Sequence, residues 1–325
     1  MERGSFRAAA LLVDAMGRDD RIKGVLSTRI NGLLGLALSF EPPPRVAQKR
    51  RARRIAADAE DAWSRMAPED ALGDLLKWGV MLGLGLAEKV WDTSDTARWV
   101  PRLRVWHPSF VDYRWDTQSY WVTTLDGQLE VPEGGGERWV VYTPYGFHRA
   151  FMGGAVRALA IPWLMRAWSR RDLARYNELY GLGMVKAIMP AGAADEDKDR
   201  FSRQVAERGA EPVIECEQDQ NGKGFDVELV QAQGTTGWQV FPATTHEADS
   251  AIAITLLGQN LSTEVREGSR AAAQVHDGVR REVTRADAAT LGSTLREQLL
   301  APWVAFNYDA PSEMVPWPTW QLEQP

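Results

Sequence analysis

The segment Leu256–Arg270, LLGQNLSTEVREGSR, is a polar break between two stretches of helical pattern. The stretch before it begins near Ala243, and the stretch after it, residues 271–306, contains almost no helix-breaking residue before Pro302. The break carries both signs of charge and no large apolar side chain after Val265, so we do not expect it to be buried. Such a loop is an exposed connector in a monomer, whereas in a ring of subunits it could line a central hole.

A compact insertion, residues 184–232, lies between two predicted helices at 156–180 and about 236–257. Periodicity and turn residues predict short alternating elements inside it. These are a strand at 185–189, a charged helix at 195–208, and strands at 213–217 and 225–230. A small α/β unit is therefore expected to be nested between two helices.

The N-terminal half combines helices with an antiparallel β region. Helical spacing covers residues 1–40 and stops at the three prolines 42–44, and further helices are predicted at 46–66 and 72–80. Turn signals such as Asp126-Gly127 separate short alternating stretches. We predict strands at 84–91, 99–106, 110–115, 119–124 and 139–143. The whole chain is expected to belong to the α+β class.

Composition limits the functional classes. The 325 residues are 44% hydrophobic and carry a net charge of −6, whereas proteins that grip nucleic acid tightly are usually basic. No apolar run is long enough to span a bilayer, and the N-terminus lacks the apolar core of a signal peptide, so we expect no membrane association. The 14 tryptophans fit either core packing or large subunit interfaces.

The sequence contains no recognisable catalytic constellation. The single cysteine, Cys216, excludes a disulfide within this chain and any multi-cysteine metal site. The four histidines have no second ligand at metal spacing, and no glycine motif for phosphates or dinucleotides occurs. One alternative is a nuclease in which Glu215, Glu217 and Asp219 hold a metal together with ligands from elsewhere. We expect no metal, no cofactor and no enzymatic activity.

Arginines and apolar residues are patterned on the predicted helices. The helix at 156–180 can gather a cluster of four cationic side chains, Arg166, Arg170, Arg171 and Arg175. On the long helix an apolar stripe is predicted, made of Val275, Val279, Val283 and Ala286. Arg281 and Arg285 are spaced i, i+4, which is unfavourable within one helix and indicates partners outside it.

Several segments match, in order, the pattern of one protein family. They are Asp20–Arg29 (DRIKGVLSTR), Gly83–Trp91 with its Ala-Glu-Lys-Val-Trp end, Tyr176–Gly181 (YNELYG), Leu257–Glu264 (LGQNLSTE), Ala273–His276 (AQVH) and Arg285–Asp287 (RAD). Together they resemble the phage Mu-like family of portal proteins from tailed bacteriophages. The resemblance covers roughly residues 20–307.

The resemblance implies a portal fold, with an α/β wing, a two-helix stem, a small α/β clip and a long wing helix, assembled into a homo-dodecamer. It divides the chain into 1–153 (N-terminal part of the wing), 154–183 (first stem helix), 184–234 (clip), 235–261 (second stem helix), 262–270 (tunnel loop), 271–308 (long wing helix) and 309–325 (C-terminal tail). The tail is too short for a helical crown, so we expect the crown to be reduced or absent.

The resemblance also implies a conduit for double-stranded DNA at one capsid vertex. Expected channel residues are Thr263, Glu264, Arg266, Glu267 and Arg270 of the tunnel loop, together with the four stem arginines. Expected docking residues of the clip are Lys186, Lys198, Arg200, Arg203 and Lys223. The implied partners are DNA bound non-specifically and transiently, the large terminase, the major capsid protein and a head-completion or adaptor protein. The ring would belong to the virion and assemble in the cytoplasm of the host bacterium.

Two other structural interpretations remain open beside the nuclease. One is a head–tail adaptor or neck ring. The other is a portal that serves a gene-transfer or phage-derived particle instead of an infectious phage.

Overall fold

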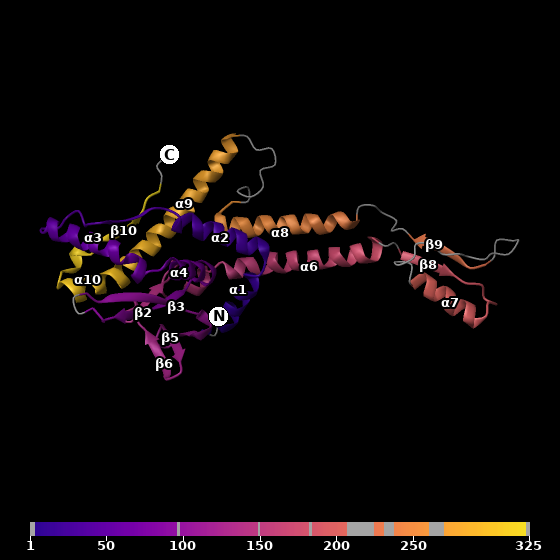
Figure 1. The fold of residues 1–325 in the computed structure, drawn as a ribbon, viewed down its shortest axis with the longest axis horizontal. Coiled ribbons are helices and arrows are strands. Elements are labelled where there is room, and N and C mark those ends of the chain that lie inside the picture. The colour runs from indigo at the N-terminus through magenta and orange to yellow at the C-terminus, as the bar shows by residue number, and fades with distance from the viewer. Residues whose placement is uncertain are drawn as a thin grey trace. The chain divides into compact units, whose positions relative to one another are not determined.

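The computed structural model describes residues 4–95, 98–148, 150–181, 184–206, 224–230, 237–259 and 270–322 (Figure 1). These residues form two compact units. Unit 1 comprises residues 1–163 and 248–325, and unit 2 comprises residues 164–247. Two helices, α6 (Val156–Gly181) and α8 (Val240–Leu257), contribute residues to both units. Every strand pair among the described residues is antiparallel, and helices accompany the sheets, which confirms the predicted α+β class.

Four helices open unit 1: α1 (Arg7–Met16), α2 (Asp20–Leu34), α3 (Lys49–Met66) and α4 (Glu69–Leu82). The side chain of Asp19 caps α2 by accepting hydrogen bonds from the backbone N–H groups of Arg21 and Ile22. The helix predicted at 46–66 is α3, which buries a face of small and apolar residues while Arg50 and Arg53 are exposed. Arg50 and Arg53 therefore lie on the solvated face of α3.

Two three-stranded sheets follow. One has the order β3-β2-β7, with β2 (Gly85–Asp92), β3 (Val100–Trp106) and β7 (Trp139–Tyr142). The other has the order β4-β5-β6, with β4 (Val111–Arg114), β5 (Ser119–Thr124) and β6 (Gly127–Val131). Of these six strands, β6 was not predicted. Helix α4 packs closely on the first sheet, because a Cβ at Gly79 would lie 2.3 Å from the ring of Tyr142.

The C-terminal part of unit 1 differs from the prediction in two respects. The long helix is divided into α9 (Arg270–Leu295), a π-helical turn (Arg296–Leu300) and α10 (Ala301–Tyr308). Pro302 lies in the first turn of α10, where its missing N–H removes no necessary hydrogen bond. Residues 38–41 are not helical but form β1 (Leu38–Glu41), which pairs with β10 (Trp317–Trp320).

Short elements complete the described chain. They are α5 (Ala150–Gly153) and three 3₁₀ turns at Pro108–Phe110, Gly237–Gln239 and Ser312–Met314.

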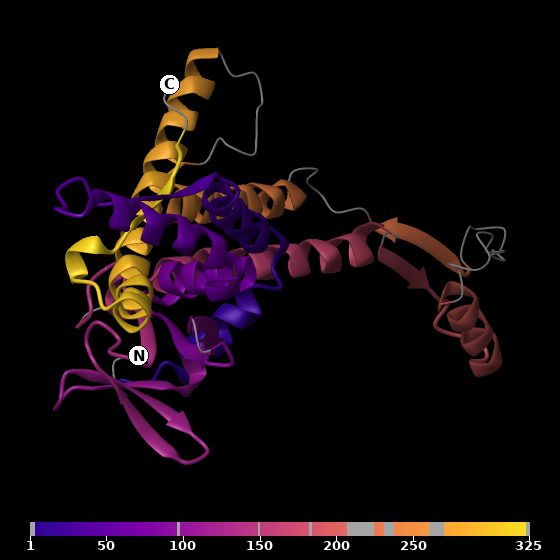
Figure 2. The same ribbon diagram turned by 60° about the vertical axis from the view of Figure 1, so that its left-hand side comes forward.

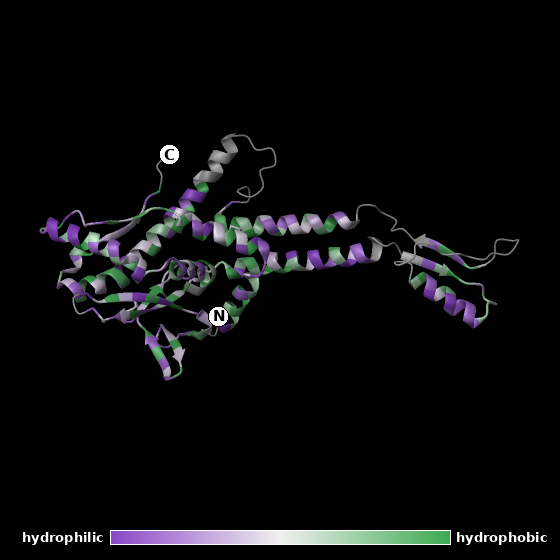
Figure 3. Ribbon diagram, in the orientation of Figure 1, coloured by the Kyte–Doolittle hydropathy of each residue, from purple (hydrophilic) through white to green (hydrophobic). Residues whose placement is uncertain are grey.

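A continuous hydrophobic core lies in unit 1, and Figure 3 shows apolar residues in all of the helices and sheets that contribute to it. Tryptophans are divided between core and surface. Trp78, Trp139, Trp303 and Trp320 are buried, whereas Trp99, Trp115, Trp168, Trp238 and Trp317 are exposed. Core packing therefore accounts for some of the tryptophans, and the exposed ones are available for interfaces.

Unit 2 contains residues 164–181 of α6, residues 240–247 of α8 and a small α/β element (Figure 2). The two helices contact each other through Ser169, whose hydroxyl donates to the carbonyl of Phe241 at 2.6 Å. Strand β8 (Met184–Ile188) pairs with β9 (Asp226–Val230), and α7 (Asp195–Ala206) packs beside them through Phe201. A nested α/β insertion is thus confirmed. The strand predicted at 213–217 and the turn at 221–222 lie outside the described residues.

Among the described residues, no helix combines the length and the apolar character that a bilayer crossing requires.

Candidate functional site at the junction of α2, α8 and α9

Three elements of unit 1 meet where the end of α8 approaches the middle of α9. Arg29 of α2 makes a bidentate ion pair with Asp287 of α9, with Nε–Oδ2 at 2.7 Å and Nη2–Oδ1 at 2.8 Å. The third nitrogen of the same guanidinium, Nη1, donates to the backbone carbonyl of Leu256 at 2.8 Å. One planar side chain therefore ties the end of α8 to the body of α9, a geometry that favours arginine over lysine.

A second arginine of α2, Arg21, contacts α8 nearer to its N-terminus. Nε and Nη2 of Arg21 both lie 3.3 Å from the carbonyl oxygen of Asp249. Arg21 and Arg29 are eight residues apart on α2, and their acceptors, Asp249 and Leu256, are seven apart on α8, so the two helices run in the same direction. Leu256 belongs to the last turn of α8, whose carbonyls have no partner within the helix and favour a nearby cation. We name Arg21, Arg29, Asp249, Leu256 and Asp287 the α2 clamp.

The ion pair of the clamp is almost removed from solvent. The side chain of Arg29 is 13% exposed and that of Asp287 is 7% exposed. Burial opposes the charge on Arg29, but the hydrogen bond and charge of Asp287 outweigh it, and the pKa of Arg29 is raised above its ordinary value. Tyr142 closes the same region, since its hydroxyl lies 3.1 Å from that of Thr290 on α9. The charges are stable in the interior only as a pair.

The chain leaves α8 in a fixed direction. Gly258 has a φ of +74° and its N–H donates to the carbonyl of Ile254 at 2.9 Å, which is a left-handed helix cap. A Cβ at this position would lie 3.2 Å from Cγ1 of Val279 on α9. Glycine is therefore required both by the backbone angle and by the close approach of α9. The cap and the clamp together define where the segment between the two helices starts.

The predicted tunnel-loop residues Thr263, Glu264, Arg266 and Glu267 lie outside the described residues. Arg270 is the first residue of α9, and its side chain also lies outside the described part. Their role at a channel stays a prediction, and the described chain resumes on either side of them at Gln259 and Arg270.

The four stem arginines do not share one exposed surface. Arg166 is buried, with 5% of its surface exposed, whereas Arg170, Arg171 and Arg175 are exposed. Arg171 forms an ion pair with the neighbouring Asp172 at 3.0 Å. The exposed part of the predicted cluster therefore has three members, because the position of Arg166 on α6 turns it toward the interior.

Four of the five predicted clip cations are described, and each has an acidic or carbonyl partner close by. Lys186 pairs with Glu228 directly across the β8–β9 ladder at 3.0 Å. On α7 the partners are local: Lys198 pairs with Asp195, Arg200 with Asp197, and Arg203 donates to the carbonyl of Asp199. Lys223 lies outside the described residues. These pairs make the described surface of β8, β9 and α7 one of mixed sign.

The predicted alternative of a metal-dependent nuclease falls largely outside the part of the chain that the structure describes. Within the described ranges, no group of three or more histidine, cysteine or carboxylate side chains is placed to hold a metal ion. Cys216, Glu215, Glu217 and Asp219 fall in the range 207–223, outside the described residues. The described residues of the junction, an arginine–aspartate ion pair and backbone carbonyls, hold three helices together.

The importance of Arg29 and Asp287 as a pair was not predicted, although both lie in segments that carry the family resemblance. The apolar stripe predicted on the long helix includes Ala286, which is exposed. The buried face instead contains Thr284, Asp287, Leu291 and Leu295. A buried aspartate on a helix signals a cationic partner, but the partner is 258 residues away in the sequence.

The architecture, with a helix pair around a small α/β insertion and a polar segment before a long helix, is that of phage portal proteins. A family described as the portal protein of Mu bacteriophage matches residues 9–325. The chain therefore belongs to the Mu-type portal protein family.

Individual relatives agree with this assignment. The portal protein of Escherichia phage Mu is 32% identical over 179 residues, which cover 51% of this chain and 33% of the relative. The Mu-like prophage FluMu protein gp29 of Haemophilus influenzae is 27% identical over 324 residues, which cover 94% of this chain and 58% of the relative. The chain thus spans between one third and three fifths of these two curated relatives.

A solved structure shares the fold at low identity. A chain from the virion of a native gene transfer agent particle matches with a TM-score of 0.53 and 13% identity, covering 93% of this chain and 92% of that chain. At this level of identity the likeness concerns the fold alone.

Proposed function

We propose that this chain is the subunit of a portal ring, the conduit through which double-stranded DNA enters and leaves a capsid at one vertex. The observation that carries the proposal is membership of the Mu-type portal family over residues 9–325. It is supported by the nested α/β insertion of unit 2 and by the clamped junction on either side of residues 260–269. The ring is proposed to be a homo-dodecamer that acts by steric and electrostatic means without catalysis.

The parts of the subunit take the roles of the portal architecture. Residues 1–153 and 271–308 form the wing, 154–183 and 235–261 the two stem helices, 184–234 the clip and 262–270 the tunnel loop. The C-terminal tail, 309–325, contributes β10 to the wing through its pairing with β1.

DNA contacts in such a conduit are made to phosphates and not to base edges. We assign them to Arg266 and Arg270 of the tunnel loop and to the exposed stem arginines Arg170, Arg171 and Arg175. The net charge of −6 limits sticking of DNA to the rest of the surface. These contacts should weaken steeply as salt increases.

Partners follow from the same proposal. The clip, with its mixed-sign surface on β8, β9 and α7, docks the large terminase during packaging and a head-completion or adaptor protein afterwards. The wing contacts the major capsid protein. The ring is a virion component that assembles in the cytoplasm of the host bacterium.

Native mass spectrometry combined with negative-stain imaging of the purified protein tests the proposal. We expect closed rings on the order of a dozen subunits, with a central hole wide enough for duplex DNA. A stable small oligomer with a closed two-fold interface and no hole would contradict it, because such an interface cannot generate a ring.

A further inference from the structure

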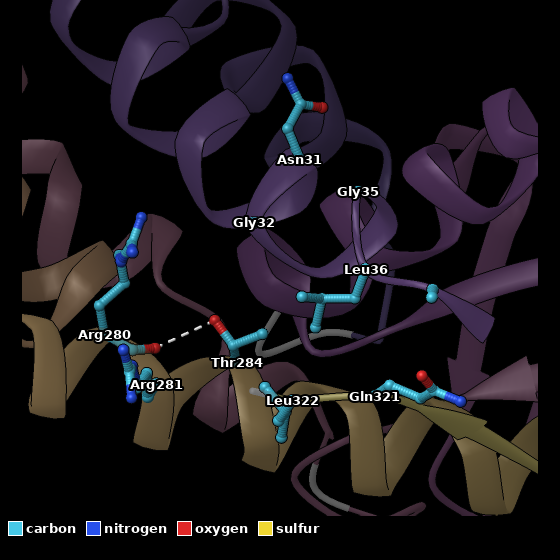
Figure 4. Close-up of a pocket in the computed structure, with 10 residues that line it drawn as sticks. Asn31, Gly32, Gly35, Leu36, Arg280, Arg281, Thr284, Gln321 and Leu322 are labelled. Carbon is cyan, nitrogen blue, oxygen red and sulfur yellow. Dashed lines mark hydrogen bonds between the residues drawn. The ribbon is translucent and has the colours of Figure 1, made fainter. Parts of the chain in front are cut away.

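A half-open groove in unit 1 lies between the end of α2, the first half of α9 and the segment that follows β10 (Figure 4). Its volume is about 630 Å³. Arg280 and Arg281 come from α9, Asn31 comes from α2, and Gln321 and Leu322 follow β10. The groove is therefore built from three segments that are far apart in the sequence, and none of the channel or docking residues assigned above lines it.

Hydrogen-bond donors dominate the chemistry of the groove. Arg280 and Arg281, consecutive residues of α9, line one end, and Asn31 and Gln321 are polar residues of the other walls. None of the described residues that line it is acidic. Guanidinium groups bind phosphate oxygens with charge-assisted and often bidentate hydrogen bonds. The groove is suited to an anion with several oxygen atoms.

The size and the walls of the groove indicate a ligand larger than a single ion. A volume of about 630 Å³ falls in the range of pockets that hold extended organic ligands, roughly 300–1,000 Å³. Gly32 and Gly35 form a wall without side chains, which leaves room for a chain-like ligand. Leu36 and Leu322 add apolar surface beside the donors. A run of sugar and phosphate groups offers anionic oxygens and apolar carbon atoms in alternation.

Thr284 lies between the arginines of the groove and the aspartate of the α2 clamp on α9. Its side chain is buried, and its hydroxyl donates to the carbonyl of Arg280 at 3.0 Å. Asp287 follows it on α9 by about one helical turn. The arginines at the groove and the ion pair of the clamp are thus on one rigid stretch of helix. Arg280 is ten residues after Arg270, or about 15 Å along the helix axis.

We propose that this groove binds a segment of the sugar–phosphate backbone of duplex DNA, with Arg280 and Arg281 contacting the phosphates. The site extends the proposed DNA contacts from the tunnel loop to the wing. This inference rests on the proposed function, because it requires duplex DNA to pass close to unit 1. It predicts binding that is independent of base sequence.

The test measures binding of a short fluorescein-labelled duplex to the purified full-length protein by anisotropy, between 50 and 200 mM NaCl. Each lost phosphate contact should reduce the slope of log K against log salt by about 1. Arg280→Ala/Arg281→Ala should therefore flatten the slope by about 2, and the affinity of the wild type should fall about tenfold more than that of the variant over this salt range. Two duplexes of unrelated sequence should behave alike.

The matched control is Arg50→Ala/Arg53→Ala, which removes the same charge from exposed positions of α3 in the same unit. It should leave the slope within experimental error of the wild type. Equal effects of the two double variants, or no effect of either, would overturn the proposal, since net charge alone would then explain the binding.

A second variant guards against damage to the fold. Asn31→Asp keeps the size of an exposed side chain and places a negative charge in the groove, so duplex affinity should fall at least threefold while the mass of the assembly stays unchanged. Inorganic phosphate should compete with the duplex. Binding of phosphate with no change in duplex affinity for any variant would assign the groove to a free anion and overturn the DNA proposal. The native mass of each sample reports on the ring separately, so failure of this inference is distinguishable from failure of the proposed function.

Discussion

Replacing Arg29 by methionine tests whether the α2 clamp is a structural requirement of the junction. The substitution leaves the carboxylate of Asp287, 7% exposed, without its bidentate partner, and removes the donor to the carbonyl of Leu256. Loss of one partner from a buried ion pair typically destabilises a protein by about 3–5 kcal/mol. For a unit of this size, a loss of about 4 kcal/mol lowers Tm by roughly 8–16 °C.

The assay is thermal unfolding followed by tryptophan fluorescence, at a protein concentration where wild type and variant have the same native mass, because oligomerisation shifts Tm. The double variant Arg29→Met/Asp287→Leu removes both charges together. Replacing a buried pair by apolar residues is often nearly neutral, so the double variant should recover most of the stability that Arg29→Met loses. A residual loss of about 1 kcal/mol is expected from the carbonyl of Leu256.

Arg54→Met is the matched control, because Arg54 is 81% exposed and lies 4.0 Å from Asp58 on the same helix. Exposed pairs of this kind contribute about 0–1 kcal/mol, so its Tm should change by at most a few degrees. The account of the junction is refuted if Arg29→Met behaves like Arg54→Met. It is also refuted if the losses of Arg29→Met and of the single variant Asp287→Leu simply add in the double variant.

Three further predictions concern other sites. Burial lowers the pKa of Lys89 from 10.5 to about 8, so between these two pH values the unfolded chain binds more protons than the folded chain, and the free energy of unfolding of wild type relative to Lys89→Met should rise with pH, by at most about 3 kcal/mol. Urea titrations of both proteins at pH 7, 9 and 10.5 measure this, and a difference in unfolding free energy that stays flat or falls with pH would contradict it. Gly258→Ala should destabilise the protein by about 1–2 kcal/mol, because φ is +74° and Cγ1 of Val279 is 3.2 Å from the new Cβ; a neutral result in the same urea assay would argue against the left-handed cap. Arg266→Ala/Arg270→Ala should reduce the DNA packaged or retained per particle while leaving ring mass unchanged, and unaltered DNA content would remove these residues from the proposed channel.

Local pattern was sufficient for many elements of the fold. The helices α3 and α6 and the strands β2, β3 and β5 were predicted within a few residues, because each has a clear period and a turn or proline at its end. The nesting of a strand–helix–strand insertion between α6 and α8 also followed from the order of these patterns. The family resemblance itself came from motif segments in order along the chain, of which Leu257–Glu264 is the most specific, and the nesting agreed with it.

Long-range pairing could not be predicted in the same way. Strand β1 was included in a helical region because its partner, β10, lies about 280 residues later, and nothing local distinguishes a four-residue strand from a frayed helix end. The π-helical turn at Arg296–Leu300 was missed for a related reason. Gln298 in this turn bonds both the N–H and the carbonyl of Val141, and Lys89 donates to the carbonyl of Gln298, so tertiary contacts stabilise the irregular backbone.

Only one part of the candidate site could be predicted from the sequence. The polar break after α8 could be identified, since a segment rich in both charges between two helices is conspicuous. The clamp could not, because an arginine on α2 and an aspartate on α9 give no indication of each other until the helices are packed. The burial of Arg166 could not be predicted either, since α6 has no single apolar face from which to infer the buried side.

The central claim is that rings of this chain surround DNA at a single capsid vertex. An asymmetric cryo-electron-microscopy reconstruction of DNA-filled particles tests it most directly. The account predicts one ring of this chain at one vertex, with residues 260–269 of each subunit beside density for duplex DNA on the ring axis. A ring found only outside the capsid shell, or copies of this chain at every vertex, would contradict it.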